Sequence, residues 1–164
     1  MSARALVAAT TAAVALSLGA TAALATSGAH FFNVGSTVNS DGSMTISYDE
    51  AGVGNATVNY TVNTNASATY ACINGGGNHP KAANKESTNG TLSISFSRDP
   101  NNGRVTGATS PSIGPLSSTL VCPSGQTFVL ACVSYTGTTL TDTTNNETTP
   151  VPDAKKTFVA IKGC

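Results

Sequence analysis

The sequence contains no tryptophan and few charged residues. Asp, Glu, Lys and Arg make up 10% of its 164 residues, and eight acidic and eight basic side chains give a formal net charge of zero. A chain without a basic field has no electrostatic reason to bind nucleic acid or an anionic membrane. Sugar platforms commonly use Trp, so its absence disfavours a carbohydrate role. The aromatic hydroxyls that remain are Tyr48, Tyr60, Tyr70 and Tyr135.

The sequence also lacks the usual sets of hydrolytic residues. It has no Gly-x-Ser-x-Gly elbow, and its two histidines, His30 and His79, fall on separate segments, which argues against a Ser-His-Asp triad. Asp49 and Glu50 are adjacent, so on a strand they point to opposite faces and cannot flank one glycosidic bond. We therefore do not expect an ordinary hydrolase, and we favour a non-enzymatic role.

The N-terminus has the layout of a secretory signal peptide. One positive charge at Arg4 precedes an uncharged run rich in Ala, Val and Leu, and small residues gather at the end of that run. Cleavage before Thr26 gives a signal peptide of residues 1–25, and cleavage before His30 gives one of 1–29. No later apolar stretch approaches the roughly 20 residues that span a bilayer. We expect a secreted, extracellular monomer that is free of the membrane, with a single domain over residues 30–164.

Four cysteines lie in the mature part, and an even number in an exported chain predicts two disulfides. They are Cys72, Cys122, Cys132 and Cys164. Three pairings are possible. We favour Cys72 with Cys122 and Cys132 with Cys164, because one turn and one strand separate Cys122 from Cys132 while Cys164 ends the chain. No Cys-x-x-Cys is present, which disfavours a zinc site.

Alternation of apolar and small polar residues predicts an all-β fold. Met44 to Tyr48, Val58 to Val62 and Leu92 to Phe96 each alternate with period two, and Phe128 to Val133 is apolar on both sides, as in a central strand covered on both faces. Residues 158–161 indicate a shorter strand of the same kind. Turn residues occur at 39–42, 89–90, 99–103 and 123–125. This spacing predicts an immunoglobulin-like β-sandwich of about eight to ten short strands.

Two segments look too polar and irregular for strands. One runs from Asp142 to Asp153. The other follows Cys72 and is the first place where we look for a ligand, because its glycines allow close backbone approach and its polar side chains offer donors and acceptors. The residues of this candidate binding loop are Asn74, Gly75, Gly76, Gly77, Asn78, His79, Lys81, Asn84 and Lys85. The loop has no Gly-Lys-Ser/Thr end and is not a phosphate loop.

Two metal sites are conceivable. If cleavage exposes His30 as the N-terminal residue, its amine and ring together with the ring of His79 form a copper-binding histidine brace. Cleavage before Thr26 removes this possibility, and no cofactor is then expected. Asp142, Asn145, Glu147 and Asp153 could offer oxygen ligands to calcium, but their spacing matches no calcium loop.

A resemblance adds to these patterns. From Asp49-Glu50-Ala51-Gly52 through Tyr70-Ala71-Cys72-Ile73-Asn74 and Gly75-Gly76-Gly77 to His79-Pro80 and Lys85, the chain resembles a group of small secreted β-sandwich proteins of actinobacteria. That resemblance implies no known activity. In architecture alone, the domain is similar to the apoproteins of enediyne chromoproteins, which are secreted immunoglobulin-like domains with two disulfides.

Three functions follow as hypotheses. The first is a non-enzymatic extracellular binding or surface-interaction module, whose ligand the sequence does not name. The second is a copper-binding protein that uses His30 and His79. The third is a secreted inhibitor or effector that acts through a loop anchored by a disulfide.

Overall fold

The computed structural model describes residues 28–74 and 84–164, and all its regular elements there are β-strands. In chain order they are β1 (His30–Val38), β2 (Met44–Ala51), β3 (Val58–Asn74), β4 (Lys85–Arg98), β5 (Arg104–Thr109), β6 (Gln126–Asp142), β7 (Glu147–Pro150) and β8 (Ala154–Thr157). Within these ranges, no helix is long and apolar enough to cross a membrane.

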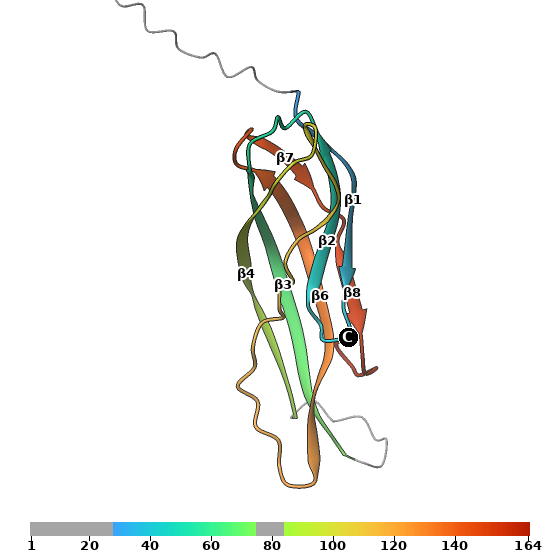
Figure 1. The fold of residues 1–164 in the computed structure, drawn as a ribbon. Coiled ribbons are helices and arrows are strands. Elements are labelled where there is room, and N and C mark those ends of the chain that lie inside the picture. The colour runs from blue at the N-terminus through green and yellow to red at the C-terminus, as the bar shows by residue number, and fades with distance from the viewer. Residues whose placement is uncertain (1–27, 75–83) are drawn as a thin grey trace, which may run out of the picture.

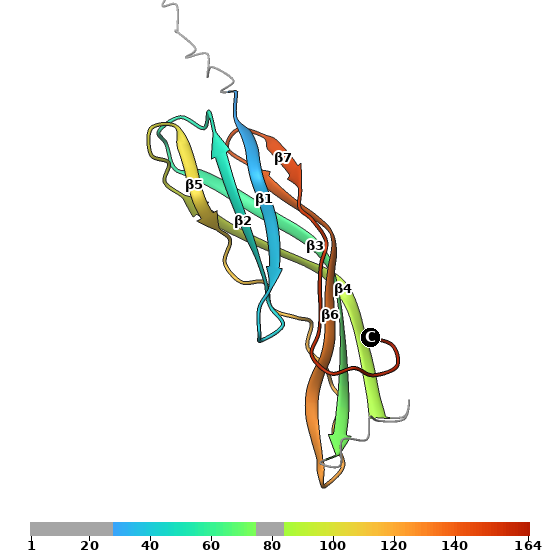
Figure 2. The same ribbon diagram turned by 90° about the vertical axis from the view of Figure 1, so that its right-hand side faces the viewer.

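The strands form two antiparallel sheets that pack as a sandwich. The smaller sheet has the order β1-β2-β5, and the larger has the order β4-β3-β6-β7, with β8 pairing a second stretch of β6. Figures 1 and 2 show that the smaller sheet covers only one half of the larger one, because β3, β4 and β6 extend well beyond it. The prediction of an all-β sandwich is confirmed.

The three long strands of the larger sheet differ from the short strands expected. β3 and β6 each contain 17 residues and β4 contains 14. Asn89 and Gly90, which the sequence suggested as a turn, instead continue β4 opposite Ser67 and Ala66. Their β-strand geometry holds because β3 pairs without interruption along the whole of β4.

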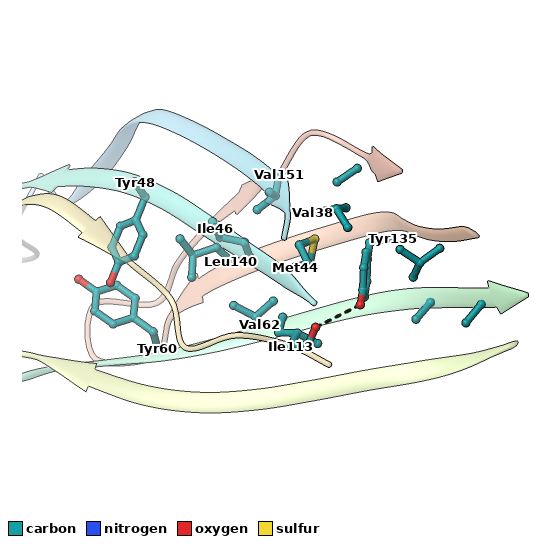
Figure 3. Close-up of a cluster of buried hydrophobic side chains, with 14 of the residues drawn as sticks. Val38, Met44, Ile46, Tyr48, Tyr60, Val62, Ile113, Tyr135, Leu140 and Val151 are labelled. Atoms are coloured by element: carbon teal, nitrogen blue, oxygen red, sulfur yellow. Dashed lines mark hydrogen bonds between the residues drawn. The ribbon is translucent and has the colours of Figure 1, made fainter. Parts of the chain in front are cut away.

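Alternation along β3 sets which side chains enter the core. Val58, Tyr60 and Val62 are buried between the sheets, while Asn59 and Asn63 are exposed on the opposite face. Figure 3 shows the resulting core, to which β2, β3 and β6 contribute large side chains. Burial of each such side chain stabilises the fold by about 1.5–3 kcal/mol relative to exposure.

A buried tyrosine joins the core to the long segment between β5 and β6. The hydroxyl of Tyr135 donates toward the carbonyl oxygens of Gly42, at 2.8 Å, and Ile113, at 3.1 Å. Figure 3 shows the bond to Ile113. The hydroxyl of Tyr70 likewise donates to the carbonyl oxygen of Leu116 at 2.6 Å. These bonds hold the irregular segment against the half of β3 and β6 that the smaller sheet leaves uncovered.

Two disulfides fasten the same half of the larger sheet, one on each face. Cys72 is bonded to Cys122, which ties the segment before β6 to the inner face, and Cys132 is bonded to Cys164. The second bond holds the C-terminal segment over Ala71, with which Ala131 and Ile161 form a separate small core. The favoured pairing is confirmed, and both bonds fit an oxidising, extracellular environment.

Two segments were assigned wrongly from the sequence. The polar stretch from Asp142 to Asp153 contains a strand, β7, which pairs Thr148 with Thr141. Residues 158–161 form bends and irregular chain after β8 and not a strand, because Val159 and Ile161 pack as a loop against Ala71 and Ala131. In both places local hydrophobicity predicted the wrong structure. Strand pairing decides it at β7, and side-chain packing decides it at residues 158–161.

Candidate functional site

The outer face of the larger sheet is a broad surface that carries almost only Ser, Thr and Asn. We call it the outer polar face. Its residues are Asn59, Thr61, Asn63, Asn65 and Ser67 on β3; Asn89, Thr91, Ser93, Ser95 and Ser97 on β4; Ser134, Thr136, Thr139 and Thr141 on β6; and Thr148 on β7. None of these side chains carries a charge.

Strand pairing arranges these side chains in rows across the sheet. One row runs from Ser95 through Thr61 and Thr141 to Thr148. The hydroxyls of Thr61 and Ser95 lie 3.1 Å apart and those of Thr141 and Thr148 lie 3.0 Å apart. Neighbouring rows are about 7 Å apart along the strands, and neighbouring strands about 4.8 Å apart. The face is therefore a regular grid of hydrogen-bonding groups.

The depressions on this face are shallow. One, of about 360 Å³, is bordered by Asn65, Asn89 and Thr136, and another, of about 520 Å³, by Asn59 and Ser97. Both are open to solvent, unlike the enclosed apolar pockets that bind small molecules. The face is better suited to a broad contact than to the enclosure of a small substrate.

No tyrosine of the domain is available to stack on a ligand. Tyr48, Tyr60, Tyr70 and Tyr135 are all buried, with at most 7% of their surface exposed. The largest exposed apolar side chains among the described residues are Val121 and Phe128, beside the Cys72–Cys122 bond. Phe128 stacks on Tyr70 at 5.2 Å between ring centroids, which ties it to the fold.

Most of the candidate binding loop lies outside the described residues. This applies to Gly75, Gly76, Gly77, Asn78, His79 and Lys81. Of the others, Asn74 ends β3 and Lys85 begins β4, so the segment is shorter than the sequence suggested. Asn84 donates to the side-chain oxygen of Gln126 at 3.2 Å, and the ammonium of Lys85 donates to the carbonyl oxygen of Lys162 at 2.5 Å.

The copper hypothesis stays a prediction. His30 is exposed at the start of β1, where its ring Nδ1 lies 2.7 Å from the carbonyl oxygen of Gly28. Its suggested partner, His79, falls outside the described residues. Among the described residues, no group of three or more His, Cys, Asp or Glu side chains could hold a metal ion.

The acidic residues considered for calcium are engaged in local hydrogen bonds. Asp142 is fully buried, and its Oδ1 accepts from the backbone N–H groups of Thr144 at 2.7 Å and Asn145 at 3.0 Å. The carboxylate of Asp153 accepts from the N–H of Gly137 at 3.0 Å. These carboxylates therefore shape turns at the two ends of β7, as Asp side chains commonly do.

A buried polar cluster was not anticipated from the sequence. The Tyr60 hydroxyl donates to Glu50 Oε2 at 2.6 Å, and both side chains are buried between the sheets. Tyr48 lies beside Tyr60 (Figure 3). Glu50 has the same parity as Ile46 and Tyr48 on β2, which was the available signal that its side chain points inward. Asp49, on the other side of β2, accepts instead from Asn33 at 2.8 Å.

Burial favours the protonated form of Glu50. Loss of solvent raises the pKa of Glu50 to about 7, although the hydrogen bond from Tyr60 lowers it, and the neighbouring Asp142 carboxylate raises it further. Oε1 of Glu50 accepts no hydrogen bond from the described residues. A proton on Glu50 lets its carboxyl group share a hydrogen bond with Asp142. The side chains of the cluster are buried in the core, so the cluster bears on stability.

The fold and surface together define a two-sheet β-sandwich with two disulfides and a broad, uncharged polar face. Comparison of the chain with protein-family models, curated proteins and solved structures returned no match. The resemblances to secreted actinobacterial proteins and to enediyne chromoprotein apoproteins therefore stay predictions, and the function has to be argued from the chain's own surface.

Proposed function

We propose that the protein is a secreted, non-enzymatic binding module that attaches through its outer polar face to a neutral polysaccharide. The observation that carries this proposal is the uncharged grid of Ser, Thr and Asn side chains across β4, β3, β6 and β7. Hydroxyl and amide groups both donate and accept hydrogen bonds, as the hydroxyls of such a polymer do.

Other partner classes fit this face less well. Protein interfaces are enriched in aromatic residues, Met and Arg, none of which occurs among the residues of the outer polar face. Anionic polymers and lipids call for Lys and Arg, which the face itself lacks, although Lys155 and Lys156 of β8 border it beside Ser134. A neutral, hydroxyl-rich polymer needs neither kind of residue.

This mode of binding differs from the aromatic stacking that the lack of Trp argues against. All four tyrosines are buried, so sugar rings would be held by hydrogen bonds alone. Each such bond contributes only about 0.5–1.5 kcal/mol net. Useful affinity therefore requires many contacts at once, which a flat face can make with a long repeating polymer and not with a monosaccharide.

The test is a co-sedimentation assay on insoluble neutral polysaccharides, with heparin beads and anionic vesicles as charged comparators. We expect retention on at least one of cellulose, chitin or starch granules and none on the charged materials. The variant N59K/N63K places two long charged side chains on the exposed centre of the face and should lose retention. The matched variant S47K/T106K adds the same two charges to exposed positions of the smaller sheet and should keep it. Retention on heparin alone, or none on any neutral polymer, would overturn the proposal.

A further inference from the structure

β4 forms a free edge of the larger sheet. It pairs with β3 alone, and no backbone hydrogen bond joins it to any other described residue. Its 14 residues therefore expose unpaired N–H and C=O groups along roughly 45 Å. Figure 1 shows β4 at the margin of the sheet, and an edge of this length is a template for pairing with another strand.

The edge also lacks the features that protect edge strands in monomeric proteins. β4 contains no proline, its register with β3 runs without a bulge from Arg98 to Lys85, and no residue from Ser87 to Ser97 is charged. Soluble β-proteins normally interrupt such an edge with Lys, Pro or a bulge. The unprotected edge of β4 therefore calls for a partner.

We propose that β4 pairs antiparallel with β4 of a second copy of this chain, with Leu92 opposite Leu92 at the two-fold axis. The resulting interface is isologous and closed, as in most homodimers. The sequence alone led us to expect a monomer. The dimer does not depend on the ligand proposed above, although it would make the outer polar face continuous across two copies.

The charges at the two ends of β4 select this register. Leu92 lies midway between Glu86 and Arg98, and also midway between Lys85 and Asp99. With Leu92 on the axis, the register therefore sets each of these four residues opposite a residue of opposite charge in the other copy, at both ends of the interface. Within one copy the four side chains also bond to their own chain, so the opposed pairs would add to these bonds. Opposed charges stabilise an antiparallel pair of strands.

Other registers lose this complementarity. Shifting the pairing by two residues in either direction sets Glu86 opposite Phe96 or opposite Pro100. A shift by one residue turns the apolar side chains of one strand to the polar face of the other. Of these registers, the one centred on Leu92 therefore sets opposite charges against each other and keeps the apolar side chains of both strands on the same face.

The remaining side chains of β4 also fit. On the inner side, Ile94 meets Gly90, beside which Leu116 of the same copy already lies, so Ile94 would join an apolar contact. Leu92 and Ile94 are only half-buried in one copy, and pairing would add to their burial, which is favourable for apolar surface. On the outer side Ser93 meets Thr91 and can form a hydroxyl pair like that of Thr61 and Ser95 within one chain.

Sedimentation equilibrium of the secreted protein tests the proposal. We expect a dimer in the wild type and a monomer in S93K/S97K, because added lysines crowd the edge and repel across it. N59K/N63K adds the same charge to the same face one strand away and should remain dimeric. A wild type that stays monomeric at about 1 mM would overturn the proposal, as would N59K/N63K dissociating as readily as S93K/S97K. Loss of polysaccharide retention in N59K/N63K with the dimer intact separates the two proposals.

Charge reversal tests the register. R98E sets a carboxylate opposite Glu86 and should weaken the dimer at least about tenfold, since two repelling pairs replace two attractive ones. The double variant E86R/R98E restores opposite charges and should restore the dimer. Glu86 accepts from Ser118 at 2.6 Å and Arg98 lies over the Phe96 ring, so melting temperatures are measured in parallel. A folded double variant no tighter than R98E would contradict this register.

Discussion

The hydroxyl of Tyr60 donates a 2.6 Å hydrogen bond to Glu50 Oε2 in the interior of the sandwich. The two residues lie on strands of different sheets, so this contact joins the sheets through a polar group in an otherwise apolar core. A buried carboxyl group with one donor and a neighbouring carboxylate favours its protonated form. The stability of the domain should therefore depend on pH through Glu50.

Replacing Glu50 with glutamine should remove this dependence. The pKa of Glu50 is raised from 4.5 in the unfolded chain to about 7 in the folded domain, so the folded state holds a proton that the unfolded state has lost. The stabilising contribution of protonated Glu50 is complete below pH 4.5 and is lost as the pH rises through 7. We expect the wild type to lose about 3 kcal/mol of unfolding free energy over this range relative to E50Q. Urea unfolding at a series of pH values measures the difference.

Glu86 should show the opposite dependence of stability on pH and serves as a control for Glu50. Hydrogen bonds from Ser118 and Thr119 lower the pKa of its carboxyl group. Its contribution is therefore present above its unfolded pKa and lost on acidification. If E50Q and the wild type show parallel pH profiles, Glu50 is ionised in the folded state, and our description of the cluster is wrong.

Removing the Tyr60 hydroxyl should both destabilise the domain and extend its sensitivity to pH. In Y60F, Glu50 Oε2 loses its donor, which costs about 1–3 kcal/mol for a buried group. Because that bond lowers the pKa of Glu50, its loss raises this pKa and moves the decline in stability to higher pH. Y70F removes a hydroxyl that bonds only the Leu116 carbonyl. It should lower stability without moving the pH at which stability declines. If stability declines at the same pH in Y60F and in the wild type, the Tyr60 hydroxyl does not influence the pKa of Glu50.

Loss of the Cys132–Cys164 bond should free the C-terminal segment before the rest of the domain unfolds. The bond closes a sequence separation of 32 residues, and C132S/C164S should lower the free energy of unfolding by about 2–4 kcal/mol. Lys162 is exposed between Ile161 and the bond, so a lysine-specific protease should cut there first. Mass spectrometry of a brief digest detects the cut, and first cleavage at Lys155 or Lys156 would show that β8 opens instead.

A side chain at Gly42 should cost more than one at Gly54. The φ of Gly42 is +87°, and a Cβ there would overlap Cδ2 of Leu130, a partly buried side chain packed against the core. Gly54 has a similar φ of +73° but open space around it. Both G42A and G54A should lower the free energy of unfolding by about 1–2 kcal/mol, because alanine disfavours the left-handed backbone. Only G42A should lower it further, because Leu130 is displaced. Equal thermal shifts in the two variants would contradict the packing around Gly42.

Sequence reasoning recovered the sandwich because the signal was local and repeated. The alternation at Val58, Tyr60 and Val62 and the even number of cysteines each depend on chemistry that a short window contains. The length of β4 could not be foreseen in this way. Asn89-Gly90 has a strong turn signature, and only pairing with Ala66 and Ser67 keeps it extended.

The candidate site was less accessible from sequence. The outer polar face joins residues of β3, β4, β6 and β7 that are up to about ninety positions apart, and only the register places Ser95, Thr61, Thr141 and Thr148 in one row. The sequence drew attention instead to the loop after Cys72, whose composition is unusual but most of which lies outside the described residues. His30 and His79 likewise stay a prediction for copper.

The central claim is that the outer polar face binds a neutral polysaccharide, and an amide NMR titration tests it most directly. ¹⁵N-labelled protein is titrated with soluble oligosaccharides of cellulose, chitin and starch. We predict chemical-shift changes along β3 from Asn59 to Ser67 and along β4 from Asn89 to Ser97, which disappear in N59K/N63K. Shifts confined to residues 74–86, or no shifts with any of the three, would contradict it.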